Sequence, residues 1–333
     1  MSTITRIEDI GKDGDPPWAI DGVLSGLTIL WGQPGAGKSF IAMSMAAAVA
    51  TGRPWLGRQT AHGQVVYVAG EGGLTNVGHR LRTALHYWGI LPIQEDYVEN
   101  AIDLSVIVPG VDLVSNPSHL FDLIGGHTKL QLLVIDTLSR CLVGDENKQE
   151  DMGKFVRALD ITKDQLGCDI LIIHHANRQD EIRGSSVLFG AADVSWHLNK
   201  GKVHSMQADK LRERDSDDAM IKMRLSPAPI IGRDQSKVYD ELGSEQTTLV
   251  VQPMKETISQ VVVISVLGKG LIEDSKQATT YSEWKAAANH LSKTDFDNAL
   301  YYILSYPGKW GITRGKEVGT FIAAGGEEYS WRQ

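Results

Sequence analysis

The chain has little cysteine, no long apolar run and no excess of positive charge. Only two of its 333 residues are cysteines, Cys141 and Cys168, which excludes a disulfide framework and fits no zinc-ligand spacing. The longest apolar run, Val261 to Leu267, is far shorter than the ~18 residues that a membrane-spanning helix needs. We therefore expect a protein with no membrane partner, whose free thiols suit a reducing cytoplasm.

The amino-terminal segment, Met1 to Pro17, is polar and acidic, without the basic start and apolar stretch of a signal peptide. The formal net charge of the chain is -8, which excludes a uniformly basic nucleic-acid coat. A locally basic channel on an acidic protein stays compatible with this charge. Hydrophobic residues make up 42% of the chain and charged residues 22%, so a sizeable core can be buried.

Apolar, β-prone runs alternate with helical stretches through the first two-thirds of the chain. The predicted strands are Leu27 to Trp31, Gln64 to Ala69, Leu130 to Asp136 and Asp169 to His175. The predicted helices are Lys38 to about Ala50, Leu74 to Trp88 and Glu150 to Gln165. Strands that are apolar on both faces and separated by helices predict a mostly parallel sheet in an α/β fold.

After Asp193 the pattern changes to successive strands with turns between them, which predicts an antiparallel extension of the sheet. These strands are Val194 to Leu198, Val203 to Ala208, Ala219 to Leu225 and Thr247 to Val251. The stretch from Ser226 to Gln246 is rich in Pro, Gly and Asp, and we expect it to be exposed.

A second, smaller unit is predicted from about Glu256 to the end of the chain. Its expected elements are three helices, Ile258 to Leu267, Thr280 to His290 and Thr294 to Leu304, and two short strands within Pro307 to Ala323. Three helices followed by a hairpin are the outline of a winged helix. The predicted division is therefore an extension over 1–17, an α/β domain over 18–255 and a winged-helix-like domain over 256–333.

The stretch from Gly32 to Ser39 fits the pattern G-x-x-x-x-G-K-[ST] and lies between a predicted strand and a predicted helix. Glycines let the backbone wrap closely around phosphates, and the N–H groups of the helix start attract negative charge. Lys38 would reach the terminal phosphates, and Ser39 would offer its hydroxyl to Mg²⁺. The predicted ATP-binding residues are Gly32, Gln33, Pro34, Gly35, Ala36, Gly37, Lys38, Ser39 and Phe40.

Two carboxylates follow other predicted strands. Asp136 ends the apolar run Leu132 to Ile135, where a carboxylate faces the ligand crevice and can hold Mg²⁺ through water. Thr137 follows it, so this strand supplies no adjacent general base. Glu71 directly follows the strand that ends at Ala69-Gly70, and it is the candidate base for the attacking water.

His174 and His175 end another predicted strand. Neighbouring strand residues point to opposite faces of a sheet, so a single cation would not take both side chains. We interpret His175 as a polar group near the terminal phosphate and His174 as a packed structural residue.

These pieces, taken together and in order, resemble the RecA/DnaB-like ring ATPases, and most closely the RepA-type plasmid and phage replicative DNA helicases. The resemblance covers roughly Trp18 to Leu225. Besides the phosphate loop and Glu71, it is carried by Val134-Ile135-Asp136-Thr137-Leu138, His174-His175-Ala176-Asn177, Arg183-Gly184-Ser185-Ser186 and Lys210-Leu211-Arg212. It implies a RecA-like P-loop NTPase core.

The resemblance also implies roles for single residues. Glu71 matches the catalytic glutamate, and His175 matches the switch residue that couples the terminal phosphate to DNA-binding loops. Lys210 and Arg212 match a Lys-x-Arg pair that reaches into a neighbouring subunit's site, where the arginine neutralises charge on the transferred phosphoryl group. Arg214 is the alternative finger if the register differs, and a solvated charged hairpin is the alternative to a finger.

In this family the loops after two of the strands face a central channel. Here these loops are about Ser139 to Asp151 and Asn177 to Ser186, and the implied DNA contacts are Arg140, Lys148, Arg178 and Arg183. Both loops also carry several carboxylates and lack aromatic stacking residues, which departs from a generic single-strand binding platform.

The resemblance implies an ATP-driven replicative DNA helicase that forms a homo-oligomeric ring, by analogy a hexamer, and moves along single-stranded DNA. A primase or an initiator protein is a candidate further partner. Two alternatives stay open: a RecA-like recombinase or recombination mediator that forms filaments, and a nucleotide-gated regulator that binds DNA or protein. For the winged-helix-like unit, partner docking and direct DNA binding are both open, because its net charge is zero over 258–333.

Overall fold

The structure, a computed structural model, describes residues 18–87, 102–108, 130–212, 219–234 and 236–254. Nearer the carboxyl end it describes 279–289, 312–314, 320–323 and the single residues Phe296, Leu300 and Ile303. The predicted extension over 1–17, the predicted helix from Ile258 to Leu267 and Arg214 lie outside these residues. None of the helices in the described part is long and apolar enough to cross a membrane.

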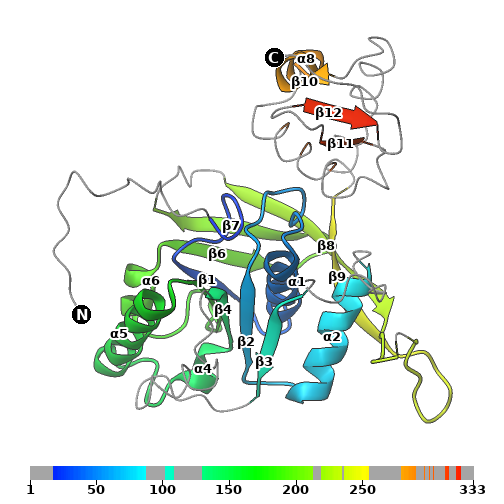
Figure 1. Ribbon diagram of the computed structural model, residues 1–333. Helices are drawn as coiled ribbons and strands as arrows, with labels where there is room; N and C mark the ends of the chain where they lie inside the picture. Colours follow the sequence, from blue (N-terminus) through cyan, green and yellow to red (C-terminus); the bar gives the residue numbers. More distant parts are fainter. Residues whose placement is uncertain are drawn as a thin grey trace, which may run out of the picture.

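One nine-stranded sheet organises the larger part of the chain, in the order β3-β2-β4-β5-β1-β6-β7-β8-β9 (Figure 1). The first six strands of that order are parallel: β3 (Leu104–Ile107), β2 (Gln64–Ala69), β4 (Leu130–Asp136), β5 (Asp169–His175), β1 (Leu27–Gly32) and β6 (Val194–Asn199). The last three run antiparallel to their neighbours: β7 (His204–Leu211), β8 (Met220–Pro229) and β9 (Thr247–Pro253). The predicted parallel sheet with an antiparallel extension is therefore confirmed.

Helices cover both faces of the sheet, with α5 and α6 on one side and α1 and α2 on the other (Figure 1). Their bounds are α1 (Lys38–Thr51), α2 (Gly73–Tyr87), α4 (Leu138–Cys141), α5 (Gln149–Leu166) and α6 (Ser186–Ala191). Successive residues of a strand point to opposite faces of the sheet, so each strand contributes side chains to two hydrophobic cores, one on each face. In β5, Leu171 and Ile173 pack toward α1, whereas Ile170 and Ile172 pack toward α5.

Helix α1 is buried almost all round, because the sheet, α2 and β9 all contact it. Small residues from Ala46 to Ala48 allow these close approaches. A helix that is apolar on every side belongs inside a protein rather than on its surface. This burial fixes the helix start, and with it the phosphate loop that precedes it.

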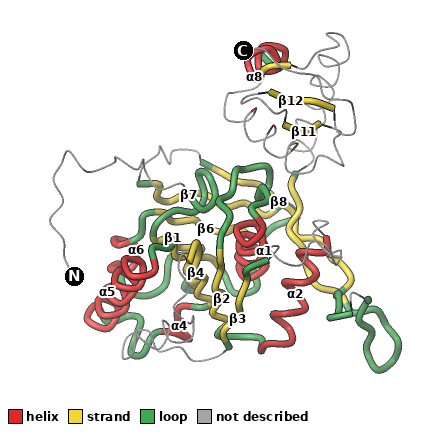
Figure 2. The backbone as a smooth tube through the Cα atoms, in the orientation of Figure 1, coloured by secondary structure: helices red, strands yellow, loops and turns green. Residues whose placement is uncertain are grey.

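The sequence predictions miss β3, α4 and α6, and they end β7, β8 and β9 too early. Strand β8 continues to Pro229 because it pairs with β9 as far as Thr247, so the first part of the predicted exposed stretch is a strand. Ala228 and Ile231 are buried there, contrary to the prediction. The remainder of that stretch does lie in a loop that projects from the sheet (Figure 2).

Near the carboxyl end, a three-stranded sheet has the order β10-β12-β11. Its strands are β10 (Thr279–Thr280), β11 (Ile312–Arg314) and β12 (Thr320–Ala323), and α8 (Tyr281–Ala287) follows β10. Trp284 and Phe296 are fully buried and meet edge to face, with ring centroids 6.2 Å apart. The short hairpin β11–β12 agrees with the predicted strands, while the winged-helix assignment stays a prediction.

A buried carboxylate, Asp169, secures the entry into β1. Its two oxygens accept the backbone N–H groups of Gly26, at 2.7 Å, and of Ala19, at 3.2 Å. Burial raises the pKa of Asp169 to about 6, above its ordinary 3.8, although these two hydrogen bonds lower it. The folded protein therefore binds the Asp169 proton more tightly than the unfolded chain does.

This raised pKa predicts a pH-dependent contribution to stability. Protonation of Asp169 stabilises the fold fully below about pH 4, and this stabilisation is lost as the pH rises through about 6. Between these limits, the free energy of unfolding of the wild type should fall by at most about 3 kcal/mol relative to that of Asp169→Asn, whose side chain cannot titrate. Urea unfolding across this range measures the difference, with exposed Asp160→Asn as the control. If the difference in unfolding free energy between the two proteins did not change with pH, the raised pKa of Asp169 would be contradicted.

Candidate functional site

The phosphate loop has the strand-loop-helix context that the pattern predicts, since β1 ends at Gly32 and α1 begins at Lys38. Gly35 and Gly37 have φ values of 71° and 96°, which favour glycine. A Cβ on Gly37 would lie only 2.3 Å from Leu225 Cδ1, so β8 packs directly over the loop. The second glycine of the pattern is therefore favoured by its backbone conformation.

Lys38 lies inside this loop and is buried. Its ammonium donates hydrogen bonds to the carbonyl oxygens of Gly32, at 2.8 Å, and Gln33, at 2.9 Å. Burial lowers the pKa of Lys38 to about 8, although the negative charges of Asp136 and Glu71 raise it. A cation held in a loop of backbone N–H groups is suited to bind the terminal phosphates of a nucleotide.

Asp136 ends β4 beside the loop and is buried. The phenol of Tyr67, on the neighbouring strand β2, donates a hydrogen bond of 2.6 Å to Asp136 Oδ2. Burial raises the pKa of Asp136, while the hydrogen bonds from Tyr67 and Ser39 lower it. Ser39 and Asp136, the two predicted Mg²⁺ residues, are thus brought together.

Tyr67 matches none of the functional sequence patterns described above. A tyrosine within the buried run Val65 to Val68 needs a hydrogen-bond partner for its hydroxyl. That need is the feature of the sequence that points to a polar contact at Tyr67. Which partner it takes depends on the β2–β4 register, in which Tyr67 pairs with Val134 and Ala69 with Asp136.

The site fits a hydrated divalent cation better than a metal bound by protein groups alone. Within the described ranges, no three His, Cys, Asp or Glu side chains gather to form a metal cage. Ser39 and Asp136 provide the hard oxygen groups, and Mg²⁺ commonly completes its octahedral shell with water and substrate phosphates. The residues present therefore suit Mg²⁺ bound together with a nucleoside triphosphate.

Glu71 lies at the same edge of the sheet, just beyond the end of β2. Its charge raises the pKa of Lys38 and of His175, so its carboxylate lies near both side chains. Glu71 Oε1 also lies 3.5 Å from the Nε of Arg140, in α4, and about half of the Glu71 side chain is exposed. A carboxylate in this place can take a proton from an attacking water.

The two histidines at the end of β5 diverge as predicted. His174 is buried, and its Nε2 lies 2.7 Å from the carbonyl oxygen of Arg183. His175 Nδ1 lies 3.3 Å from the Lys38 ammonium, so His175 faces the phosphate loop. Burial, followed by the Lys38 charge, lowers the pKa of His175, which favours the neutral ring.

The loop after His175 is tied directly to the phosphate loop. The side-chain amide of Gln33 donates to the carbonyl oxygen of Asn177, at 3.0 Å, and to Asp180 Oδ1, at 2.8 Å. Ala176 N also donates to the carbonyl oxygen of Gly32. A shift of the phosphate loop would therefore displace the predicted DNA-facing segment from Asn177 to Ser186.

Phe40, the last predicted nucleotide-binding residue, lines a cavity of about 410 Å³ between α2 and strands β8 and β9. The guanidinium of Arg80 lies over its ring, 5.0 Å from the centroid. Because Phe40 directly follows Ser39, this cavity adjoins the phosphate loop.

The four predicted DNA contacts divide into two pairs. Arg140 faces Glu71, and Arg183 forms an ion pair with Glu146. Lys148 and Arg178 are exposed, and neither has an ion-pair partner within the part of the chain that the structure describes. These two side chains are therefore the better candidates for contacts to a phosphate backbone.

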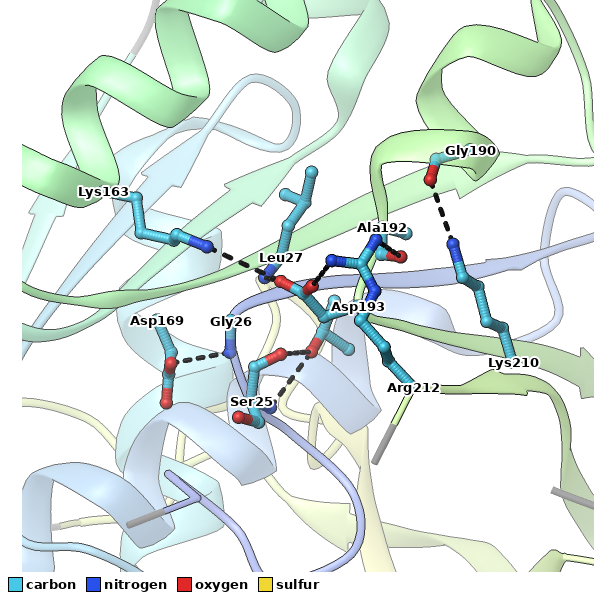
Figure 3. Close-up of polar contacts among 11 residues, drawn as sticks. Ser25, Gly26, Leu27, Lys163, Asp169, Gly190, Ala192, Asp193, Lys210 and Arg212 are labelled. Carbon is cyan, nitrogen blue, oxygen red and sulfur yellow. Dashed lines mark hydrogen bonds and ion pairs between the residues drawn. The ribbon is translucent and has the colours of Figure 1, made fainter. Parts of the chain in front are cut away.

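Lys210 and Arg212 lie near the start of β1, where they contact Gly190, Ala192 and Asp193 (Figure 3). Leu211 pairs with Val194 in β6, and Val194 pairs with Thr28 near the start of β1. The phosphate loop begins at Gly32, the other end of β1, roughly 13 Å from Thr28 along the strand. The predicted finger residues therefore cannot join the phosphate loop of their own chain.

The Tyr67–Asp136 hydrogen bond can be tested with Tyr67→Phe. We expect the free energy of unfolding to fall by about 1–3 kcal/mol, because a buried carboxylate oxygen loses its donor. Nucleotide binding should also need several-fold more Mg²⁺, because Asp136 loses a group that stabilises its charged form. Urea unfolding and Mg²⁺ titrations of fluorescent nucleotide binding measure these effects. Exposed Tyr239→Phe is the control, and equal behaviour of both variants would contradict the assigned role.

Comparison with known families agrees with this geometry. The sequence model of a family described as an AAA domain matches residues 6–181, which is more than half of the chain and includes the phosphate loop, Glu71, Asp136 and His175. Such domains bind nucleotide, typically with Mg²⁺, and hydrolyse ATP. The chain therefore belongs to the AAA domain family and is a P-loop ATPase.

Proposed function

We propose that this P-loop ATPase is a ring-forming replicative DNA helicase that moves along single-stranded DNA. One observation carries the proposal: the predicted catalytic groups lie at two different ends of the sheet. Lys38, Glu71 and His175 lie at the carboxyl end, whereas Arg212 lies at the amino end. A complete site then requires the amino end of a second copy, and head-to-tail contacts of this kind generate rings when they close.

Each residue at the carboxyl end has a distinct task in the proposed reaction. Lys38 binds the terminal phosphates, Ser39 and Asp136 hold Mg²⁺, and Glu71 accepts the proton of the attacking water. Mg²⁺, when bound, neutralises charge on the phosphate oxygens. Arg212 of the adjacent copy stabilises the charge that develops on the transferred group, so hydrolysis depends on assembly.

The connection from the phosphate loop to DNA runs through His175 and Gln33. His175 contacts Lys38, and Gln33 binds the segment that begins at Asn177. A change at the terminal phosphate would shift this segment, which carries the exposed Arg178. DNA contact through a few cations on an otherwise acidic protein implies modest, salt-sensitive binding. A cytoplasmic location and a primase or initiator partner complete the proposal.

Two alternatives differ in assembly or in turnover. A RecA-like recombinase would use the same site in open helical filaments, and a nucleotide-gated regulator would bind DNA or protein with little hydrolysis. The placement of Glu71 beside Lys38 favours hydrolysis over gating alone.

The shared site predicts that two inactive variants restore each other. Glu71→Gln should lower the turnover number by about 10²–10⁴ because the base is lost, and Arg212→Ala should lower it by about 10³ or more because the finger is lost. Mixed together, they should regain ATPase activity wherever an intact Glu71 site meets an intact Arg212. The control replaces the first variant by Glu71→Gln/Arg212→Ala, which should restore nothing. No recovery in the first mixture would contradict a finger in trans.

Helicase activity itself is tested with forked DNA that carries 5′ or 3′ single-stranded tails. We expect ATP-dependent unwinding from one tail, ATPase stimulation by single-stranded DNA and closed rings in electron micrographs. Lys38→Ala should be inactive in both assays, because the phosphates lose their cation. Filaments on DNA would replace the helicase by a recombinase, whereas the absence of turnover with and without DNA would favour a regulator.

A further inference from the structure

Asp193 lies at the amino end of the sheet, immediately before β6, where it meets two cations from opposite sides (Figure 3). Arg212 Nη1 lies 2.8 Å from Asp193 Oδ1, and Lys163 Nζ lies 3.6 Å from Oδ2. The Asp193 side chain is only 21% exposed, whereas that of Arg212 is 54% exposed. The ion pair thus joins an anchored carboxylate to a guanidinium that faces outward.

The anchor of Asp193 is the sheet itself. Its Oδ2 accepts the backbone N–H of Leu27, the first residue of β1, at 2.8 Å. A Cβ on Gly26, whose φ is 58°, would lie 2.2 Å from the same oxygen, so the carboxylate packs directly against the backbone. Its position is therefore fixed by main-chain atoms rather than by mobile side chains.

Arg212 keeps donors available while it is held. The guanidinium has five N–H donors; one nitrogen faces Asp193 and another donates to the carbonyl oxygen of Ala192, at 3.5 Å. The Arg212 backbone N–H also donates to the carbonyl oxygen of Asp193, at 3.0 Å. The remaining donors lie on the exposed side chain, beside a cavity of about 470 Å³ that Arg212 and Asp193 both line.

Lys210 is held differently, although it lies only two residues before Arg212, near the end of β7. Its ammonium donates to the carbonyl oxygens of Phe189 and Gly190, at 3.2 and 3.0 Å, and does not share the Asp193 carboxylate. Of this pair, Arg212 is thus the side chain that Asp193 orients.

We propose that Asp193 is a positioning residue that holds Arg212 in the orientation needed to complete the ATP site of an adjacent copy of this chain. This inference rests on the proposed function, because it assumes that Arg212 acts in trans. A long arginine side chain has many rotamers, and fixing one of them before assembly lowers the entropy lost when the site closes.

A structural role is the competing explanation, since Asp193 also secures the start of β1. Asp169 provides a matched comparison, because it secures the same entry through Gly26 and has no contact with Arg212. If Asp193 only secures the start of β1, substitutions of Asp193 and of Asp169 should therefore have the same effect.

The test uses the mixed assembly in which Glu71→Gln subunits lend Arg212 to Arg212→Ala subunits. Asp193→Asn is added either to the lending subunit or to the receiving subunit. In the lending subunit it should lower the recovered ATPase turnover number by about tenfold to a hundredfold, because Arg212 loses its orientation. In the receiving subunit it should have no further effect, because that subunit has no Arg212 to hold. Asp169→Asn should show no such asymmetry.

Each outcome decides between the explanations. A loss confined to the lending subunit supports the positioning role. Equal losses of ATPase turnover from both placements would mean that Asp193 only stabilises the fold, and no loss from either would mean that it has no measurable role. Either result overturns the proposal. If the mixture of Glu71→Gln and Arg212→Ala subunits, without any change at Asp193, recovers no ATPase activity, the proposed function is contradicted. That result is distinct from any response to Asp193→Asn. Nucleotide affinity of the receiving subunit, which a folding defect would alter, is measured alongside.

Discussion

The parallel register of β1, β2, β4 and β5 is the constraint on which the site depends. In a parallel sheet all strands end at one edge, so residues that follow four separate strands become neighbours there. Lys38, Glu71, Asp136 and His175 come from four distant parts of the sequence, yet the charges of the first three all affect the pKa of His175. Tertiary pairing of the strands, rather than any local motif, therefore brings together the residues predicted to bind phosphate, hold a cation and activate water.

Much of this arrangement could be predicted because strand ends are marked in the sequence. The strands predicted to end at Asp136 and His175 do end at these residues in the structure. The phosphate loop lies between β1 and α1 as its pattern requires. Polar residues directly after buried strands had to meet at one edge, so their proximity followed from fold class alone.

The partners of these residues could not be predicted, because they depend on register between segments far apart in the sequence. Tyr67 reaches Asp136 across 69 positions, and Asp193 accepts the N–H of Leu27 across 166. The extent of β8 was misjudged for the same reason: Pro227 and Pro229 suggested a loop, but pairing with β9 overrides that local preference. Local composition therefore predicts strand ends better than cross-strand contacts.

Strand β1 links the two halves of the proposed mechanism. Its carboxyl end continues into the phosphate loop, and its amino end holds Asp193, which in turn holds Arg212. This strand is buried along its whole length between β5 and β6, so it behaves as a rigid element. In a head-to-tail assembly, a subunit that moves as it binds or hydrolyses nucleotide would carry its own finger with it. The state of one site would thereby set the completeness of the next, which is the dependence that stepwise movement along DNA requires.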